Sequence, residues 1–380
     1  MKTAVIGVGN MGSKYAAMIM GGKVGGMQLC ALTRFHDRYK ELLQPATDRQ
    51  IPVYQSADAL FDDIDAGNLE PDAVIIATPH ESHEVIALKA MQRKIHVLCD
   101  KPAGVYSRQA RNMIAAAEEN QCVFGMIFNQ RALPINQKIH EIIKSGKYGA
   151  LKRVNWTVTD WYRPEKYYAS GSWRATWKGE GGGVLLNQCP HNLDLLQWFC
   201  GMPVRIQAFC KEGHYHNIEV EDDATLYMEW ENGASGTFVT STADAPGINR
   251  LEISLEEALI RAENGKLMIG ELVQELGMKE SEYRRSTDEC FRKIHGTWKE
   301  ISLPAADNPY ITVLQAFTDT VSGNGSLIAS GSEGINSLLI SNGAYLSSWT
   351  HRMIDLPERE SEEEKIFEKE FESYLNGKRR

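Results

Sequence analysis

The chain has 380 residues, an apolar fraction of 43% and a formal net charge of −9. This length is typical of two domains, and the acidic balance argues against a nucleic-acid partner, because neutralising phosphates requires surplus lysine and arginine. No apolar run reaches the length that spans a bilayer, so no membrane partner is expected. Seven cysteines without a Cys-x-x-Cys pair, and no apparent secretory signal, predict reduced thiols in a cytoplasmic protein.

The first third of the sequence alternates short apolar runs with helical patterns. Strands are predicted over residues 3–8, 28–33, 73–78, 95–99 and 122–128, and helices over residues 11–20, 83–93 and 107–120. Strand–helix alternation with nearly continuous apolar strands indicates a parallel sheet covered on both faces. We therefore predict an α/β dinucleotide-binding domain over residues 1–128.

The turn after the first predicted strand contains a Gly-x-Gly-x-x-Gly sequence. Following a strand and opening a helix, this sequence is typical of a dinucleotide site. Its glycines allow a tight turn and close approach of a pyrophosphate, which the helix N-terminus attracts. The residues predicted to contact the cofactor here are Gly7, Gly9, Asn10, Met11 and Gly12.

The end of the second predicted strand bears on the choice between NAD and NADP. An NAD site usually has a carboxylate here for the ribose 2′-hydroxyl, whereas this chain has Thr33 followed by Arg34. Arg34 or Arg38 could pair with a 2′-phosphate, which favours NADP. Asp37 could still fold back toward the ribose, and both arginines could instead lie in a solvated loop.

Further cofactor contacts are expected where the later strands end. Thr78 and Pro79 would line the nicotinamide half of the site, and His83 either joins them or only begins the next helix. Asp100 and Lys101 follow an apolar strand, which delivers them to the rim of the sheet where α/β folds bind ligands.

After about residue 129 the pattern changes to strands. These are predicted over residues 151–161, 204–210, 224–230, 236–240 and 251–254, with helices over 134–145, 310–322 and 332–348. A turn at residues 231–233 predicts a hairpin. We predict an α+β domain over residues 129–356 with a large, mostly antiparallel open sheet.

Residues 357–380 form a charged tail of separate character. Ser361 is a candidate N-cap, and Phe367, Phe371, Tyr374 and Leu375 fall on one helical face. The helix is expected either to dock on its own chain or to bind a partner.

The chain resembles a known oxidoreductase family over residues 1–356. The glycine fingerprint, Thr78-Pro79 with His83, Asp100-Lys101-Pro102, Asn129-Gln130-Arg131, and Gly181-Gly182-Gly183 leading to His191 and Asp194 occur in that family's order and spacing. The family is that of glucose–fructose oxidoreductase, inositol dehydrogenase and rhizopine catabolism (Gfo/Idh/MocA). The resemblance implies a Rossmann domain for NAD or NADP, with Asn129 among the cofactor contacts. It also implies a C-terminal sheet that forms homodimers or homotetramers.

The resemblance also implies three catalytic residues, Lys101, Asn187 and His191. Lys101 matches the family's catalytic lysine, although Asp100 stands where the family usually has glutamate. His191 matches the acid/base histidine, and Asn187 replaces the usual aspartate. Neutral His191 can accept a hydroxyl proton while the Lys101 ammonium stabilises the developing alkoxide. Residues four apart share a helix face, but Pro190 must begin or kink that helix.

Aromatic residues crowd between residues 156 and 177, interleaved with two arginines. Aromatic faces suit the C–H faces of a sugar ring, and arginine forks suit hydroxyls or carboxylates. The alternative is that most of these aromatic residues are core or interface. The predicted substrate contacts are Tyr162, Trp173 and Arg174, together with Lys101, Asn187 and His191.

Two histidines, His214 and His216, lie near Glu219 and Glu221 and could suggest a metal site. No further Cys or His closes such a site, so we predict no metal.

These residues predict hydride transfer between the nicotinamide and a secondary hydroxyl or ketone of a sugar, glycoside or cyclitol. The alternatives are a glycosidase that works by transient redox on a bound NAD, and a dinucleotide-binding regulator without catalysis.

Overall fold

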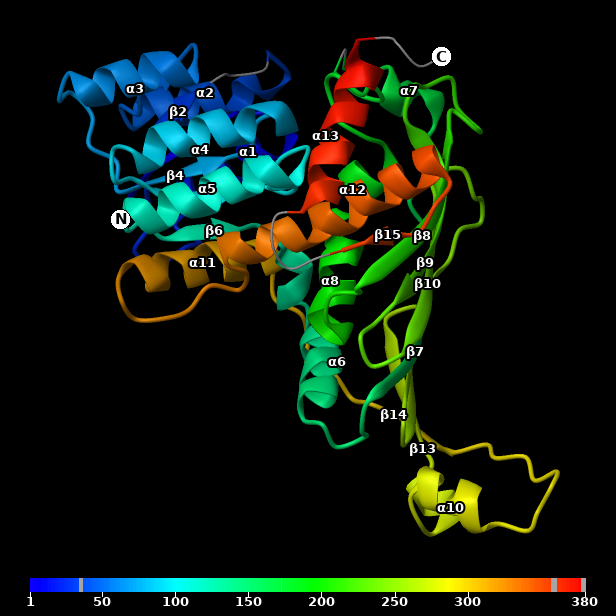
Figure 1. The fold of residues 1–380 in the computed structure, drawn as a ribbon. Coiled ribbons are helices and arrows are strands. Elements are labelled where there is room, and N and C mark those ends of the chain that lie inside the picture. Colours follow the sequence, from blue (N-terminus) through cyan, green and yellow to red (C-terminus); the bar gives the residue numbers. More distant parts are fainter. Residues whose placement is uncertain (34–36, 172, 357–360, 377–380) are drawn as a thin grey trace. The chain divides into compact units, whose positions relative to one another are not determined.

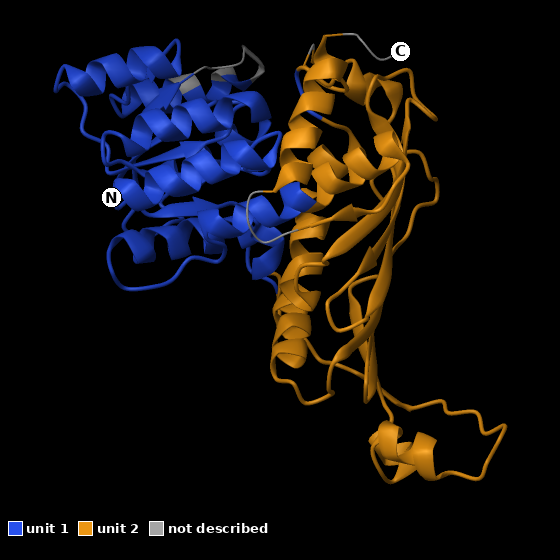
Figure 2. Cartoon of the chain, in the orientation of Figure 1, with its two compact units in different colours: residues 1–132, 179–181, 306–339 blue, residues 133–178, 182–305, 340–380 orange. Residues whose placement is uncertain are grey.

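The computed structural model describes residues 1–33, 37–171, 173–356 and 361–376 (Figure 1). The chain divides into two compact units (Figure 2). Unit 1 contains Met1–Ala132, Gly179–Gly181 and Ala306–Leu339. Unit 2 contains Leu133–Lys178, Gly182–Ala305 and Ile340–Arg380. The segment Ala306–Leu339, which we expected within the second domain, clusters with unit 1.

Unit 1 is built on a parallel sheet of six strands in the order β3-β2-β1-β4-β5-β6. The strand order reverses between β1 and β4, and this is the point at which such sheets bind dinucleotides. The predicted α/β Rossmann fold is confirmed. The strands are β1 (Lys2–Ile6), β2 (Gln28–Thr33), β3 (Val53–Tyr54), β4 (Ala73–Ile76), β5 (His96–Cys99) and β6 (Phe124–Met126).

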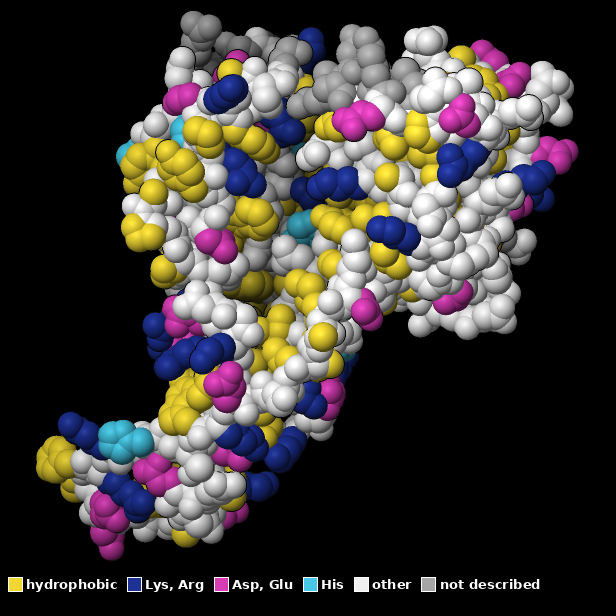
Figure 3. All heavy atoms as spheres, turned by 180° about the vertical axis from the view of Figure 1, so that it is seen from behind, with side chains coloured by type: hydrophobic (Ala, Val, Ile, Leu, Met, Phe, Trp, Pro, Cys, Tyr) yellow, Lys and Arg dark blue, Asp and Glu magenta, His cyan; other side chains and the backbone are white. Residues whose placement is uncertain are grey.

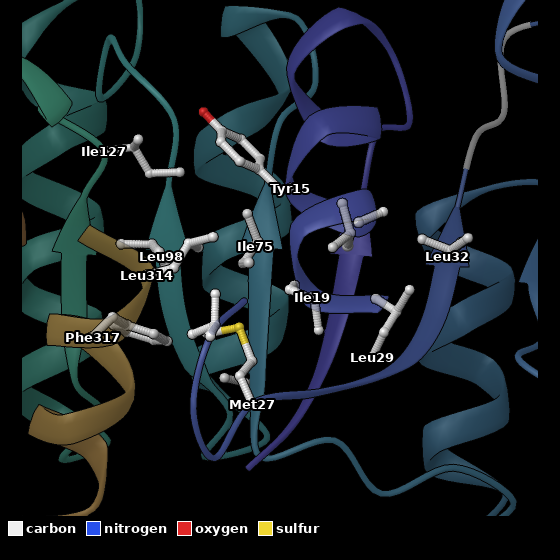
Figure 4. Close-up of a cluster of buried hydrophobic side chains, with 14 of the residues drawn as sticks. Tyr15, Ile19, Met27, Leu29, Leu32, Ile75, Leu98, Ile127, Leu314 and Phe317 are labelled. Carbon is white, nitrogen blue, oxygen red and sulfur yellow. The ribbon is translucent and has the colours of Figure 1, made fainter. Parts of the chain in front are cut away.

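Helices cover both faces of this sheet, because its strands are apolar on both sides. Figure 4 shows one covered face, where Tyr15 and Ile19 from α1 and Phe317 from α11 pack near Ile75 and Leu98. Fully burying each such side chain contributes about 1.5–3 kcal/mol. The helices are α1 (Asn10–Met20), α2 (Leu43–Asp48), α3 (Ala57–Asp65), α4 (His83–Met91), α5 (Ser107–Glu119) and α11 (Pro309–Val321).

Unit 2 contains a nine-stranded sheet in the order β14-β13-β12-β11-β7-β10-β9-β8-β15. Its neighbouring strands pair antiparallel except β7 with β10, which are parallel. The mostly antiparallel open sheet is therefore confirmed. The strands are β7 (Leu151–Val158), β8 (Arg205–Glu212), β9 (Glu221–Glu229), β10 (Ser235–Ser241), β11 (Asn249–Leu255), β12 (Ala258–Glu263), β13 (Lys266–Glu271), β14 (Thr297–Glu300) and β15 (Ile354–Asp355).

Helices α6 (Pro134–Lys144) and α8 (Pro190–Cys200) lie along one face of this sheet (Figure 1). Short α9 (Val273–Leu276) and α10 (Glu280–Ser286) form a lobe between β13 and β14 at the end of the sheet. Charged side chains of both signs are interspersed with apolar ones on this lobe (Figure 3). No helix among the described residues is long and apolar enough to cross a membrane.

The C-terminal helix α13 (Glu362–Leu375) docks on its own unit, the first of the two outcomes expected for the tail. Phe367 and Phe371 are 2% and 5% exposed. The Phe367 ring stacks on Trp349 of α12 (Gly334–Thr350) with centroids 5.6 Å apart. Ser361 caps the helix by accepting from the amide of Glu364, as its sequence position predicts.

Candidate functional site

The glycine turn between β1 and α1 has the geometry of a dinucleotide cradle. Gly7 has φ +95°, and a Cβ there would lie 2.7 Å from the Ala77 carbonyl oxygen. A Cβ on Gly12 would lie 2.1 Å from the Gly7 oxygen, so these two glycines allow the turn and the helix to pack closely. A Cβ on Gly9 would meet no atom within 4 Å. The space over Gly9 is open, as approach of a pyrophosphate requires.

The N-terminus of α1 suits an anion. No side chain caps it, and no acidic residue lies in its first turn, which begins at Asn10 and Met11. Uncapped N–H groups and the helix dipole together attract phosphate oxygens. The residues present therefore fit the pyrophosphate of a nicotinamide dinucleotide.

The end of β2 closes one side of this turn. The amides of Gly7 and Val8 lie 3.3 and 3.1 Å from the Thr33 carbonyl oxygen, to which they donate. Thr33 is fully buried, and its hydroxyl has no hydrogen-bond partner within the described part of the chain. The backbone carbonyl of Thr33 thus holds the glycine turn against β2. Arg34 and the side chain of Arg38 lie outside the described residues.

His83 connects two loops at the carboxyl edge of the sheet. Its Nδ1 lies 2.9 Å from the Pro102 oxygen and its Nε2 lies 2.8 Å from the Thr78 oxygen. The ring is 1% exposed, and burial lowers the pKa of His83, although both carbonyls favour the protonated form. His83 thus holds the Thr78 loop against the loop that carries Lys101, and it is also the first residue of α4.

Asp100 is held by two donors at the end of β5. The Tyr15 hydroxyl donates to Oδ2 at 3.2 Å, and the Lys101 amide donates to Oδ1 at 2.9 Å. Burial raises the pKa of Asp100, and the neighbouring Lys101 charge opposes this. Burial also raises the pKa of Tyr15. The carboxyl group therefore fixes the backbone of the lysine loop to the helix that begins at the glycine turn.

The remaining predicted cofactor residues follow the same edge of the sheet. Thr78 and Pro79 follow β4. The Ser82 hydroxyl donates to the Thr78 hydroxyl oxygen and to the Pro79 carbonyl oxygen. Asn129 follows β6 and is 7% exposed, and its Oδ1 has no hydrogen-bond partner among the described residues. Because carboxyl ends of parallel strands share one edge, the glycine turn, Thr78, Lys101 and Asn129 all belong to one rim.

In unit 2, Asn187 and His191 lie on successive helical segments. Asn187 belongs to a π-helical turn, Val184–Gln188 (η4), and Pro190 is the first residue of α8. Proline thus begins the helix, and the two residues do not share one continuous α-helix. The sequence spacing alone left this open.

The hydroxyl of Tyr167 is the centre of a polar cluster in unit 2. Its oxygen accepts from Arg174 Nη1 at 2.8 Å, from Asn187 Nδ2 at 3.2 Å and from Gln188 Nε2 at 3.1 Å. Arg174 lies over the Trp173 ring, 4.4 Å from its centroid. The structure therefore brings two of the predicted substrate residues, Arg174 and Asn187, to one phenol oxygen, and a third, Trp173, lies against Arg174.

Other aromatic residues of this segment have different surroundings. Tyr162 is 52% exposed, and its backbone carbonyl accepts from the Arg163 side chain. Trp156 is 5% exposed and packs on Phe199 and Phe238, so it is core, as the alternative stated above proposed for most of these rings.

The histidines near β9 serve the loop in which they lie. His216 Nδ1 lies 2.8 Å from Asp222 Oδ2, and its Nε2 lies 2.8 Å from the Arg163 oxygen. Asp222 also accepts from the amides of residues 214–216. Within the described residues there is no group of three His, Cys, Asp or Glu side chains that could hold a metal.

Four residues of these arrangements were not predicted from the sequence as site residues. Tyr15 lies on a helix face that indicates only core, and nothing in the spacing pairs it with Asp100. Tyr167 belonged to the aromatic segment without a signal that set it apart. The four are Tyr15, Tyr167, Gln188 and Glu221, and the last is described below.

Two family models match the chain. The oxidoreductase family model for the NAD-binding Rossmann fold matches residues 1–128. The GFO/IDH/MocA C-terminal domain model matches residues 136–261. Together they cover more than half of the sequence. The chain belongs to the Gfo/Idh/MocA oxidoreductase family.

The chain is also similar to individual named proteins. The chain is 28% identical over 200 residues to the rhizopine catabolism protein MocA of Rhizobium meliloti, covering 52% of this chain and 59% of that protein. It is 26% identical over 275 residues to the 1,5-anhydro-D-fructose reductase of Ensifer adhaerens, covering 72% of this chain and 76% of the reductase. The match therefore spans about six tenths of MocA.

The WlbA dehydrogenase of Bordetella pertussis, in complex with NADH and UDP-GlcNAcA, has a similar fold. Its TM-score is 0.75 at 21% identity, over 94% of this chain and 99% of that one. This similarity shows that the two proteins share one fold over nearly all of this chain.

Proposed function

We propose that this chain is an oxidoreductase that uses NAD(H) or NADP(H) and acts on a secondary hydroxyl or ketone of a sugar, glycoside or cyclitol. The observation that supports it most is the cradle in unit 1, where open space over Gly9 and an uncapped helix meet a rim that includes Lys101. The match to an NAD-binding family model and the names of the relatives support the same class of reaction.

The cofactor would be held by the glycine turn and the first N–H groups of α1. Its nicotinamide, when bound, supplies the site that accepts or donates hydride. Asn129, Thr78 and Pro79 would line the rim beside it. Sequence favours NADP through Arg34 and Arg38, and we retain this preference as a proposal. An Arg34→Ala, Arg38→Ala double variant is then expected to weaken NADP binding by at least 10-fold and leave NAD binding unchanged, as measured by calorimetry.

The chemistry assigned to this chain's own side chains follows from their types. Lys101 stabilises the alkoxide that develops as the hydroxyl loses its proton, and His191 accepts that proton near neutral pH. Asn187 cannot titrate, so it orients a hydroxyl by hydrogen bonds. Reduction of a ketone uses the same groups in reverse. Trp173 and Arg174 would contact the substrate ring and its hydroxyls.

The direct test is a screen of the purified protein with NAD⁺ and NADP⁺ against cyclitols, free sugars, sugar acids and glycosides, following nicotinamide absorbance. Lys101→Ala and His191→Ala should each reduce kcat by at least 100-fold. Lys89→Ala is the matched control, because Lys89 is exposed and pairs with Asp58. Near-normal turnover in Lys101→Ala would show the mechanism to be wrong. Absence of net turnover across the panel would favour the glycosidase or the regulator.

We also propose that the uncovered sheet face of unit 2 joins copies of this chain. Phe209 on β8 and Tyr227 on β9 are 62% and 38% exposed. Phe209 is opposite Thr225 and Gln207 is opposite Tyr227, so both aromatic side chains are diagonal neighbours on one face. Light scattering after size exclusion should give a dimer or tetramer, and Phe209→Asp should lower that mass.

A further inference from the structure

Glu221 is a buried carboxyl group directly beneath the turn that carries Asn187. It is 1% exposed at the start of β9. Its Oε2 accepts from the Gly183 amide at 2.8 Å, and its Oε1 accepts from the Leu185 amide at 2.9 Å. The Tyr345 hydroxyl donates to Oε1 at 2.8 Å. Three donors thus occupy both oxygens of one side chain.

The backbone of the turn also lies against the backbone of β9. A Cβ on Gly183 would lie 1.9 Å from the Glu221 carbonyl oxygen, and one on Gly182 would lie 2.3 Å from the Tyr345 hydroxyl. The two glycines are therefore required for this close approach. This packing gives a physical reason for glycine at positions 182 and 183 of the motif.

The far end of the same turn is held by a different residue. Asn187 and Gln188 both donate to Tyr167, as described above. The next residue, Cys189, has its Sγ 3.1 Å from the Thr240 hydroxyl, and α8 begins directly afterwards. Glu221 at one end and Tyr167 at the other thus determine where Asn187 lies and how α8 enters.

We propose that Glu221 is a positioning residue: it holds the turn that carries Asn187, and through it the start of α8 with His191, in the geometry the reaction needs. The inference rests on the proposed function of those two residues. Glu221 touches backbone amides of the turn and a tyrosine, and acts only through them. A buried hydrogen-bonded support of this kind is how precise side-chain placement is usually maintained, and misplacement by about 1 Å can cost 100-fold in rate.

Burial makes the charge state of Glu221 sensitive to pH near neutrality. Tyr345 from α12 and Cys210 from β8 are the titratable neighbours, and η4 contributes backbone amides only. Burial raises the pKa of Glu221 to about 7, against the lowering effect of its hydrogen bonds. A glutamine at this position cannot ionise, and its amide nitrogen cannot accept from Gly183.

The test compares Glu221→Gln with Glu257→Gln in the full-length protein. Glu257 is a matched control, because it is 9% exposed and also accepts from a backbone amide, that of Glu280 at the start of α10. Hydrogen exchange by mass spectrometry should rise at least 10-fold over residues 183–189 in Glu221→Gln only. With an active substrate, kcat should fall about 10- to 100-fold in that variant while NAD⁺ affinity is unchanged.

Unchanged exchange over residues 183–189 in Glu221→Gln overturns the inference whatever the activity. Faster exchange over these residues, combined with a wild-type kcat and an unaltered pH profile of kcat, also overturns the inference. If Glu221→Gln does not fold, Tyr345→Phe removes one of the three donors, and it must change exchange and kcat in the same direction or the inference is wrong. A wild type that turns over no substrate counts against the proposed function instead, and the exchange comparison still decides whether Glu221 holds the turn.

Discussion

The hydroxyl of Tyr15 donates to Asp100 across 3.2 Å, from the second turn of α1 to the end of β5. Helix α1 begins at the glycine turn, and Asp100 accepts the amide of Lys101. One buried hydrogen bond therefore connects the segment that would bind the pyrophosphate with the loop of the proposed catalytic lysine. The two motifs are far apart in sequence, and this contact makes them one rigid part of unit 1.

Replacing Tyr15 with phenylalanine should weaken both stability and catalysis. The buried Asp100 carboxyl would lose a donor, and leaving such a group unsatisfied costs about 1–3 kcal/mol. We expect urea unfolding at pH 7 to show this loss, and kcat to fall about 10-fold because the Lys101 loop loses its anchor. Tyr310→Phe is the control, since the Tyr310 ring lies 5.9 Å from that of Tyr15, whereas the hydrogen bond to Asp100 comes from the Tyr15 hydroxyl. Equal effects in both variants would contradict the prediction.

Alanine at Gly9 and at Gly12 should separate cofactor binding from folding. A methyl group on Gly9 meets no protein atom within 4 Å, so Gly9→Ala should retain the wild-type Tm. The same methyl group occupies the space of the pyrophosphate, so calorimetry should show NAD⁺ binding weakened at least 10-fold.

Gly12→Ala places its methyl group 2.1 Å from the Gly7 oxygen. It should lower the Tm as well as the affinity, because such overpacking costs about 1–3 kcal/mol. Wild-type affinity in Gly9→Ala would mean that the dinucleotide does not lie over this turn.

The sequence predicts the fold of residues 1–128 well because each signal there is local. Apolar runs with glycine at the strand–helix turn indicate a parallel sheet, and the carboxyl-edge rule then places Thr78, Lys101 and Asn129 on one rim without knowledge of side-chain packing. The same rule carries no information on Tyr15, whose partner is 85 residues away along the chain.

The site in unit 2 was less predictable for a related reason. Asn187 and Trp173 were found through their motifs, but Tyr167, to which Asn187 donates, has no local pattern of its own. The π turn, Val184–Gln188, depends on the contact of Gly183 with β9, which no spacing in the sequence reports. Long-range polar contacts of this kind are specified by tertiary packing.

The stability of the protein should depend on pH through Glu221. Its pKa is about 7 in the fold and 4.5 in the unfolded chain, so the folded state binds more protons between these values. The contribution is fully present below pH 4.5 and is lost as the pH rises through 7, a change of about 3 kcal/mol. Urea unfolding from pH 5 to 8 should show this decline in the wild type relative to Glu221→Gln. Parallel pH curves for the two proteins would mean that Glu221 keeps an ordinary pKa.

Removing the aromatic contact of α13 should release this helix without unfolding the rest of unit 2. Phe371 is 5% exposed and packs against Trp177, with ring centroids 6.1 Å apart. Large-to-small changes at buried phenylalanines cost about 3–5 kcal/mol, and a terminal helix can relieve that cost by local detachment. Phe371→Ala should therefore expose residues 361–376 to limited proteolysis while the urea midpoint of the remaining fold stays near the wild-type value. Leu375→Ala, at a residue that is 41% exposed, is the control and should keep wild-type resistance. A large fall in the urea midpoint of the whole protein would instead show that α13 is integral to the core of unit 2.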